Sequence, residues 1–291
     1  MRELDYLAPT SIAEAVQVLG ERGEGARVLS GGTDIIVQAR EGRRNVEALV
    51  DVKDIPETRA LRFEADGSLT IGAAAPCAEI YENADIVRSY PGLIDAASLI
   101  GGIQIQSRAS LGGNLCNSSP AADSIPALIA LVATCRIAGP EGERTIPVEE
   151  FCTGPGANQL ARGEMLVSIH LPAPAPNSGA AFQRFIPRNE MDIAVCNCGA
   201  SLVLSADGQS IESARVALGA VAPTPLLVEG AAAALVGNAP DDAALDRAAE
   251  AAAAAARPIT DMRGSVAQRR HLAAVLTRRV LRVALERARG S

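Results

Sequence analysis

The sequence predicts an α+β protein of two domains. The chain opens with a strand–helix–strand pattern, continues as short strands mixed with helices up to a proline-rich segment, and then shows three strand-like segments followed by three helices. Its 291 residues suit either one large domain or two ordinary ones. The change in composition at the proline-rich segment favours two.

Composition excludes several classes of protein. The hydrophobic fraction of 48% is sufficient for a core, and the scarcity of aromatic residues predicts a core of Ala, Val, Leu and Ile. The net charge of -7 argues against nucleic acid as the main partner. A membrane-spanning helix needs about 20 consecutive apolar residues, and no stretch of the sequence approaches this length. Residues 1–6 carry charges where a signal peptide needs an apolar run, so we expect a cytoplasmic protein.

The six cysteines and two histidines predict no metal site. The cysteine spacings contain no C-x-x-C pair, so they do not form a zinc or iron–sulfur ligand set. In a reducing cytosol we expect free thiols.

The first subdomain, residues 1–57, is predicted to form a small parallel sheet. Ser11 can cap a helix whose apolar face ends at Leu19, and Thr33 can cap a second helix. The expected strands are residues 4–8, 26–29 and 49–52.

The second subdomain, residues 58–177, is predicted to mix strands and helices. The expected strands are residues 69–73, 136–138, 143–148 and 165–171, and the expected helices are 78–88, 91–99 and 126–134.

Three prolines within residues 172–176 predict a stiff linker, which separates a domain of residues 1–177 from a carboxyl-terminal domain of residues 178–291. In the second domain, an antiparallel sheet is expected from residues 181–186, 194–204 and 211–218. Helices are expected at 225–235, 242–257 and 265–289.

A first double-glycine loop, Gly31-Gly32, follows an apolar strand and precedes Thr33 and Asp34. A glycine turn between a strand and a helix can direct backbone N–H groups at a phosphate. The alternative is a tight turn that only needs positive φ. Neither a Walker loop nor a G-x-G-x-x-G motif is present.

A second double-glycine loop, Gly112-Gly113, lies within residues 107–123, where Leu111 and Leu115 are the only large aliphatic residues. Such a segment can wrap closely around a ligand, although an ordinary surface loop remains an alternative. Asp123 either caps the next helix or accepts a hydrogen bond from a ligand. Two such loops can hold two ends of one long anionic molecule, which indicates a dinucleotide cofactor.

Arginines occur in two further places. Arg184 and Arg188 lie near the domain boundary, where ligands often bind, or they belong to a solvated strand edge. The arginines of the last helix, which include Arg269, are predicted to form a solvated face, with contact to an acidic partner subunit as the alternative.

Several segments together resemble the FAD-binding medium subunit of the molybdenum hydroxylases, the family of xanthine dehydrogenase and carbon monoxide dehydrogenase. The segments are Asp-Tyr-Leu-Ala-Pro-Thr-Ser-Ile-Ala-Glu-Ala at residues 5–15, Gly-Gly-Thr-Asp at 31–34, Leu-Gly-Gly-Asn-Leu at 111–115, Pro-Ala-Ala-Asp at 120–123 and Met-Asp-Ile-Ala at 191–194. Their order and spacing cover nearly the whole chain.

The resemblance implies a vanillyl-oxidase-type FAD-binding domain of two α+β subdomains. A carboxyl-terminal domain with a three-stranded antiparallel sheet and a helical bundle would follow. FAD would lie between the two subdomains and against the carboxyl-terminal domain.

The resemblance also implies cofactor-binding residues. Backbone amides of residues 30–34 and 110–114 would hold the pyrophosphate, with the Asp34 carboxylate pointing away. Arg184 and Ile193 fall where some relatives carry a lysine near the flavin and a tyrosine stacked on it. The implied set is Leu29, Ser30, Gly31, Gly32, Thr33, Asp34, Ile35, Ser110, Gly112, Gly113, Asn114, Cys116, Asp123, Leu166, Val167, Arg184 and Ile193.

The implied function is that of an FAD-carrying electron-transfer subunit with no catalytic side chain of its own. Electrons would come from the [2Fe-2S] clusters of a small subunit, after a large molybdopterin-binding subunit has oxidised the substrate, and would pass to NAD+, a quinone or another acceptor. The implied assembly is a dimer of heterotrimers, a heterohexamer. The alternatives are a stand-alone flavin oxidoreductase and a flavin-free assembly subunit.

Overall fold

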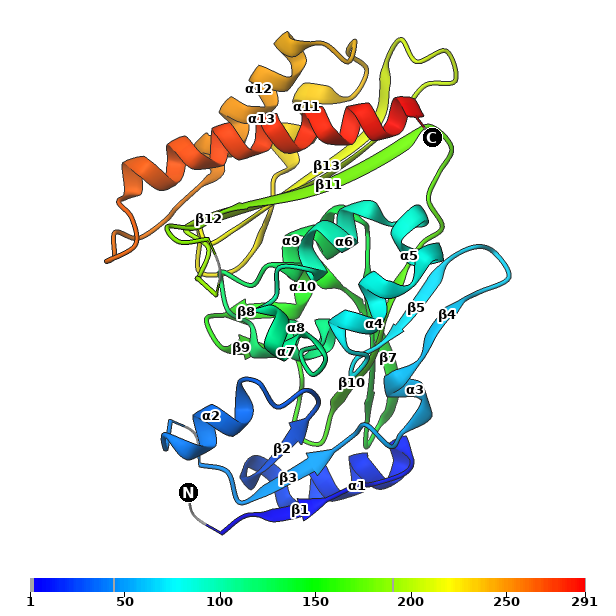
Figure 1. The fold of residues 1–291 in the computed structure, drawn as a ribbon, viewed down its shortest axis with the longest axis vertical. Helices are drawn as coiled ribbons and strands as arrows, with labels where there is room; N and C mark the ends of the chain where they lie inside the picture. Colours follow the sequence, from blue (N-terminus) through cyan, green and yellow to red (C-terminus); the bar gives the residue numbers. More distant parts are fainter. Residues whose placement is uncertain (1–2, 44, 190, 291) are drawn as a thin grey trace.

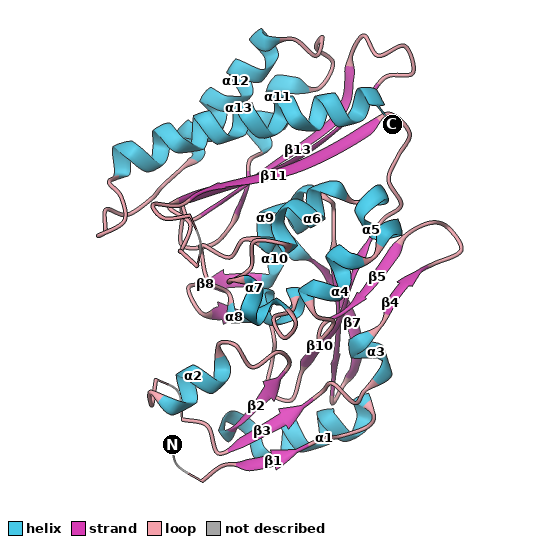
Figure 2. Cartoon of the chain, viewed as in Figure 1, coloured by secondary structure: helices cyan, strands magenta, loops and turns pink. Residues whose placement is uncertain are grey.

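The computed structural model describes residues 3–43, 45–189 and 191–290, so the first two residues of the opening segment discussed above lie outside it. Three units, each built around its own sheet, are stacked along the long axis of the molecule (Figure 1). Each unit contains both helices and strands, as Figure 2 shows, and the predicted α+β class is confirmed.

The first unit is a parallel sheet of three strands in the order β1-β3-β2, with helix α1 against it, as predicted from its alternating elements. The central strand is buried along its whole length because strands flank it on both sides. The elements of this unit are β1 (Asp5–Leu7), α1 (Ile12–Arg22), the 3-10 turn η1 (Gly23–Gly25), β2 (Ala26–Leu29), α2 (Ile35–Arg40) and β3 (Ala48–Asp51).

The middle unit is a five-stranded antiparallel sheet in the order β4-β5-β10-β6-β7, together with short helices and a two-stranded ribbon. Its core contains apolar residues from both the sheet and the helices. The elements are α3 (Pro56–Arg59), β4 (Leu61–Phe63), β5 (Leu69–Gly72), α4 (Cys77–Glu82), α5 (Ala84–Ser89), α6 (Pro91–Ala97), α7 (Ile103–Gln106), α8 (Leu111–Asn117), α9 (Ser124–Ala130), β6 (Thr134–Gly139), β7 (Gly142–Pro147), α10 (Val148–Phe151), β8 (Cys152–Gly154), β9 (Ala157–Asn158) and β10 (Met165–Leu171).

The third unit is an antiparallel sheet in the order β11-β12-β13-β14, which lies between two layers of helices. The long helix α13 crosses β11 and β12 on one face, whereas α6 and α9 of the middle unit contact the sheet as well (Figure 1). The elements are β11 (Ser178–Phe185), β12 (Cys196–Leu204), β13 (Ile211–Gly219), β14 (Leu226–Leu227), α11 (Glu229–Leu235), α12 (Asp242–Ala255) and α13 (Val266–Gly290).

Local structure differs from the sequence prediction in several places, of which three bear on the site or on the sheets. The helix expected at 78–88 is broken at Asn83, whose side chain accepts from the N–H groups of Asp85 and Ile86 and so begins a new helix. The second glycine loop is helical, because Gly112 and Gly113 lie in the first turn of α8. The third sheet has three long strands as expected, and the two-residue β14 adds a fourth.

Arg269 is not on a solvated face, which corrects the prediction for the last helix. Its side chain is 5% exposed. One guanidinium nitrogen donates to the carbonyl oxygens of Val195 and Ala220 at 2.9 and 2.7 Å, and another donates to both carboxylate oxygens of Asp261. Arg269 thereby ties the start of α13 to the ends of two strands of the third sheet.

We predict that Arg269→Ala lowers the free energy of unfolding by about 2–3 kcal/mol, because it removes charge-assisted hydrogen bonds from buried carbonyl groups. Urea denaturation measures this. Arg282→Ala is the control, because the pair between Arg282 and Asp242 is exposed and should cost less than about 1 kcal/mol. Equal losses in the two variants would contradict the structural role of Arg269.

All six cysteines are free, and burial raises the pKa of the Cys77, Cys116 and Cys198 thiols to about 12. A raised pKa means that the reactive thiolate is scarce at neutral pH. At pH 8 a thiol of pKa 12 is ionised to a fraction of about 10⁻⁴. We therefore predict slow modification of these three thiols by a disulfide reagent at pH 8 in the native protein. In denaturant all six cysteines should react quickly. Fast modification of Cys116 in the native protein would contradict the raised pKa of its thiol.

Candidate functional site

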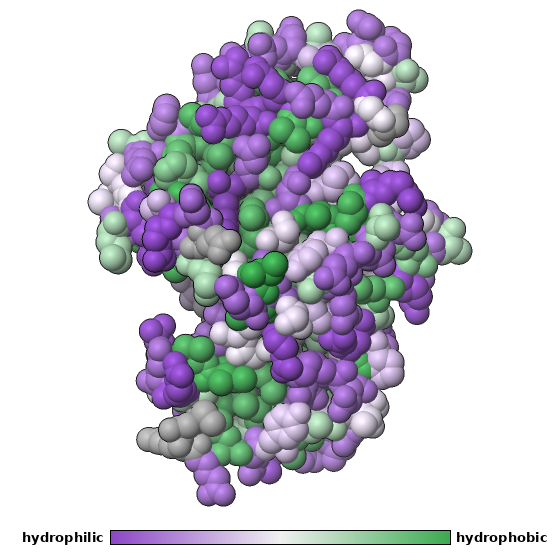
Figure 3. Space-filling model, viewed as in Figure 1, coloured by the Kyte–Doolittle hydropathy of each residue, from purple (hydrophilic) through white to green (hydrophobic). Residues whose placement is uncertain are grey.

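A cleft of about 520 Å³ lies between the first and the middle units. Its walls come from the loop between β2 and α2, from α8, and from the segment around β9 and the start of β10. The molecular surface is indented on this side, between the part that carries α2 and the middle of the molecule (Figure 3). Twelve of the residues singled out from the sequence line the cleft: Ser30, Gly31, Gly32, Thr33, Asp34, Ile35, Ser110, Gly112, Gly113, Asn114, Cys116 and Leu166.

The first glycine loop leaves the carboxyl end of a parallel strand, the end at which open α/β sheets bind ligands. The N–H groups of residues 31–34 donate to no acceptor within the described part of the chain. Gly32 has φ +80°, a conformation that L side chains rarely adopt. A short run of unpaired N–H groups at the wall of a cleft suits an anionic ligand.

The second double glycine begins α8. Ser110 caps this helix, and its Oγ accepts from the N–H of Gly113 at 3.0 Å. The N–H of Gly112 has no acceptor among the described residues, as is usual in the first turn of a helix. The start of α8 therefore offers a further donor to the cleft.

The glycines of the two loops serve different purposes. A Cβ on Gly31 would lie 2.0 Å from the carbonyl oxygen of Arg108, and a Cβ on Gly112 would lie 2.4 Å from that of Ala73. These two glycines allow backbones to meet. By contrast, a Cβ on Gly113 would meet only serine side chains within 4 Å, the nearest being the Ser110 Oγ at 3.0 Å. Gly113 thus keeps part of the cleft wall bare.

The two loops contact each other directly. The hydroxyl oxygens of Ser30 and Ser110 are 2.7 Å apart, and the Ser30 hydroxyl also donates to the carbonyl oxygen of Ala73 at 3.3 Å. Farther along the cleft, the Gln38 amide donates to the Asn117 side chain at 3.1 Å and so joins α2 to α8. These bonds hold the two walls of the cleft in one arrangement.

Asp34 lies on the cleft wall and remains in contact with solvent. The surrounding protein nevertheless desolvates its carboxyl group and raises the pKa above its usual range. Asp34 is the N-cap residue of α2, a position that the sequence predicted for Thr33. Its carboxylate makes no capping hydrogen bond to the helix.

Five residues of the predicted set do not line the cleft: Leu29, Asp123, Val167, Arg184 and Ile193. Leu29 and Val167 are buried in the core, and Ile193 is 49% exposed. Their cofactor roles stay a prediction.

Asp123 and Arg184 form a buried ion pair with each other, and Arg184 also donates to the carbonyl oxygen of Leu99 at 3.0 Å. Burial raises the pKa of Asp123, against the opposing effects of Arg184 and of the amide of Asn197. The pair connects the start of α9 to β11 and β12, so it joins the middle unit to the third.

Sequence reasoning missed the polar residues that brace the cleft from outside the glycine motifs. The Asn158 amide donates to the carbonyl oxygen of Cys116 at 2.9 Å, and the Lys53 ammonium donates to the carbonyl oxygen of Ser30 at 3.2 Å. Nothing in the sequence distinguishes Asn158 as a residue of the site. Lys53 could have been singled out, because it is the only lysine among the 27 Lys and Arg residues.

Other kinds of site are not supported by the described residues. They contain no group of three His, Cys, Asp or Glu residues placed to hold a metal ion. None of the helices in the described ranges combines the length and apolar character needed to cross a membrane.

Comparison with known proteins identifies the family. Residues 2–174 match the family model described as FAD binding domain in molybdopterin dehydrogenase, and residues 181–284 match the CO dehydrogenase flavoprotein C-terminal domain. The chain is 33% identical to the xanthine dehydrogenase FAD-binding subunit of Escherichia coli O157:H7, over 98% of this chain and 97% of that protein. It is 34% identical to the carbon monoxide dehydrogenase medium chain of Afipia carboxidovorans, over 98% of each chain.

Solved structures support the same family assignment. Reconstituted CO dehydrogenase from Oligotropha carboxidovorans matches with a TM-score of 0.93 and 32% identity, covering 98% of this chain and 99% of the matched one. Quinoline 2-oxidoreductase from Pseudomonas putida 86 matches with a TM-score of 0.89 and 28% identity, covering 99% and 98%. The chain therefore belongs to the family of FAD-binding medium subunits of the xanthine dehydrogenase and carbon monoxide dehydrogenase type, and it is a flavoprotein subunit of an oxidoreductase.

Proposed function

We propose that this chain holds FAD in the cleft between its first and middle units and serves as the electron-transfer subunit of a molybdenum hydroxylase. The observation that carries the proposal is the set of N–H groups at residues 31–34 and at Gly112 that have no acceptor among the described residues, beside the bare backbone of Gly113. A pyrophosphate needs such donors and such space.

The residues on the cleft wall fit the parts of the cofactor. The backbone N–H groups of the two glycine segments would hold the pyrophosphate, and Leu166 would offer an apolar surface to the rings. Bound FAD supplies a redox group that accepts electrons singly or in pairs. The task of this chain is to bind and orient that group.

Neither of the two histidines lines the cleft, so no imidazole base stands among the described residues of its wall. This favours electron transfer over oxidation of an organic substrate by this chain alone. We infer that a large molybdopterin-binding subunit oxidises the substrate and that a small [2Fe-2S] subunit delivers the electrons. NAD+, a quinone or another carrier would then accept them.

The relatives that support this assembly include carbon monoxide dehydrogenase medium chains, which are named as one chain of a larger enzyme. We propose a dimer of heterotrimers in the cytoplasm. We also propose that the FAD-binding domain spans residues 1–177, with subdomains 1–57 and 58–177, and that residues 178–291 form the second domain.

We predict that Gly113→Val abolishes FAD binding, because a branched side chain would occupy the cleft where the cofactor needs a bare backbone. Flavin content after purification and titration of the flavin-free chain with FAD measure the effect. Gly230→Val is the matched control: Gly230 also lies near the start of a helix, and its Cβ would meet only the Ala251 Cβ, at 3.7 Å. Full flavin content in folded Gly113→Val would refute the assignment of the loop.

We also predict that the native protein purifies with flavin absorbance, with iron–sulfur absorbance and with two further subunits. The visible spectrum, combined with identification of the co-purifying chains, tests this. Flavin in a solitary chain would favour a stand-alone oxidoreductase. A colourless chain that FAD cannot reconstitute would overturn the proposal.

A further inference from the structure

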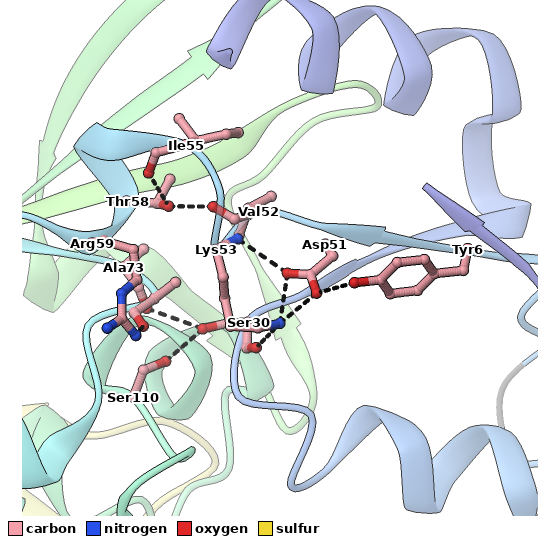
Figure 4. Close-up of polar contacts among 11 residues, drawn as sticks. Tyr6, Ser30, Asp51, Val52, Lys53, Ile55, Thr58, Arg59, Ala73 and Ser110 are labelled. Carbon is pink, nitrogen blue, oxygen red and sulfur yellow. Dashed lines mark hydrogen bonds and ion pairs between the residues drawn. The ribbon is translucent and has the colours of Figure 1, made fainter. Parts of the chain in front are cut away.

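Behind the first glycine loop lies a polar network of Tyr6, Asp51 and Lys53, none of which lines the cleft (Figure 4). The Lys53 ammonium donates to both carboxylate oxygens of Asp51, at 2.5 and 2.6 Å, and to the carbonyl oxygen of Ser30 at 3.2 Å. The Tyr6 hydroxyl donates to the Asp51 Oδ2 at 2.6 Å. We call this chain of hydrogen bonds, from Tyr6 through Asp51 to Lys53, the lysine relay. Its last contact is the carbonyl oxygen of Ser30 in the first glycine loop.

The lysine relay is built from the carboxyl end of the first sheet. Asp51 is the last residue of the central strand β3, and its neighbour in register on β2 is Leu29, the residue before Ser30. The Asp51 and Lys53 side chains are 9% and 23% exposed. Burial by itself would raise the pKa of Asp51, yet the hydrogen bonds from Lys53 and Tyr6 outweigh it and keep the pKa below its usual range. Asp51 therefore stays charged and holds the ammonium in place.

Lys53 is the only lysine in the chain, and 26 other positions carry arginine. The site explains this exception. Three acceptor oxygens converge on one nitrogen atom, and an ammonium group supplies three donors from a single point. The planar guanidinium of arginine spreads its donors over a fork and does not match three convergent acceptors.

The contact with Ser30 fixes the orientation of one peptide group. A trans peptide is planar, so its N–H points opposite to its carbonyl. Because the Ser30 carbonyl faces Lys53, the N–H of Gly31 points away from Lys53 within the same plane. This N–H has no acceptor among the described residues, and Gly31 lines the cleft. A cation on the carbonyl also polarises the peptide and strengthens its N–H as a donor.

We propose that Tyr6, Asp51 and Lys53 act as positioning residues that orient the Ser30–Gly31 peptide toward the cofactor phosphates. The inference rests on the proposed binding of FAD in this cleft. Removal of the ammonium frees the peptide to rotate and weakens the donor, so the pyrophosphate loses a preorganised contact.

The test compares FAD binding by the full-length, flavin-free wild-type chain and by Lys53→Met. We expect the dissociation constant to rise about ten- to a hundredfold, the range for one charge-assisted hydrogen bond. Lys53→Arg is expected to remain weakened, because arginine cannot place three donors at one point. Arg62→Met is the control: Arg62 also pairs with an acid two residues away, Glu64, but it is exposed and does not line the cleft. Its affinity should equal that of the wild type.

A double variant separates positioning from folding. Lys53→Met leaves the buried Asp51 carboxylate with fewer partners, which by itself lowers stability. In Asp51→Asn/Lys53→Met this uncompensated charge is gone, so the melting temperature should recover while FAD affinity stays low. Recovery of both would show that Lys53 is only structural and would overturn the proposal.

The single lysine allows a direct readout that needs no enzyme activity. Selective ¹⁵N labelling of lysine gives one side-chain ammonium signal, and we expect FAD to shift it in the wild type. An unshifted signal in wild-type protein that binds FAD, or wild-type affinity in Lys53→Met, would overturn the lysine relay alone. A wild-type chain that binds no FAD would instead overturn the proposed function.

Discussion

The close approach of two backbone segments, one from each of the first two units, is the constraint on which the cleft depends. Gly31 of the first unit lies against the carbonyl of Arg108 in the middle unit, with no room for a Cβ, and Gly112 lies equally close to Ala73 within the middle unit. The Ser30 and Ser110 hydroxyls complete the contact. Because these contacts fix both loops at once, the unpaired N–H groups of the two loops face one cleft, which a single anionic ligand can occupy.

Charge around the cleft is arranged so that the donors remain available. The Lys53 ammonium is paired with the Asp51 carboxylate and donates to the carbonyl oxygen of Ser30. Lys53 therefore contacts the first glycine loop without placing an unpaired cation on the cleft wall. Asp34 lies on the wall itself, where desolvation raises the pKa of its carboxyl group. Backbone dipoles therefore contribute to the attraction for an anion, together with Arg27 and Arg162, which also line the cleft.

The sequence was sufficient to predict much of the fold and only part of the site. Strand and helix periodicity placed the parallel opening sheet and the long last helix, because both patterns are local. The glycine motifs placed the two loops. By contrast, the helical start of α8 was missed because a Gly-Gly pair weakens a helix, and the cap from Ser110 compensates only in the folded chain. The burial of Arg269 depends on carbonyls contributed by distant strand ends, which no periodicity reveals.

The third unit reaches the cleft through a short series of polar contacts. Arg184 on β11 pairs with Asp123 at the start of α9. The next residue, Ser124, donates through its hydroxyl to the side-chain oxygen of Asn114, which lies on the cleft wall, at 2.6 Å. The orientation of Asn114 is thus set from the side of the third unit, although Arg184 does not itself line the cleft. A unit that does not line the site can still influence its geometry, because the buried polar groups between them are held by hydrogen bonds.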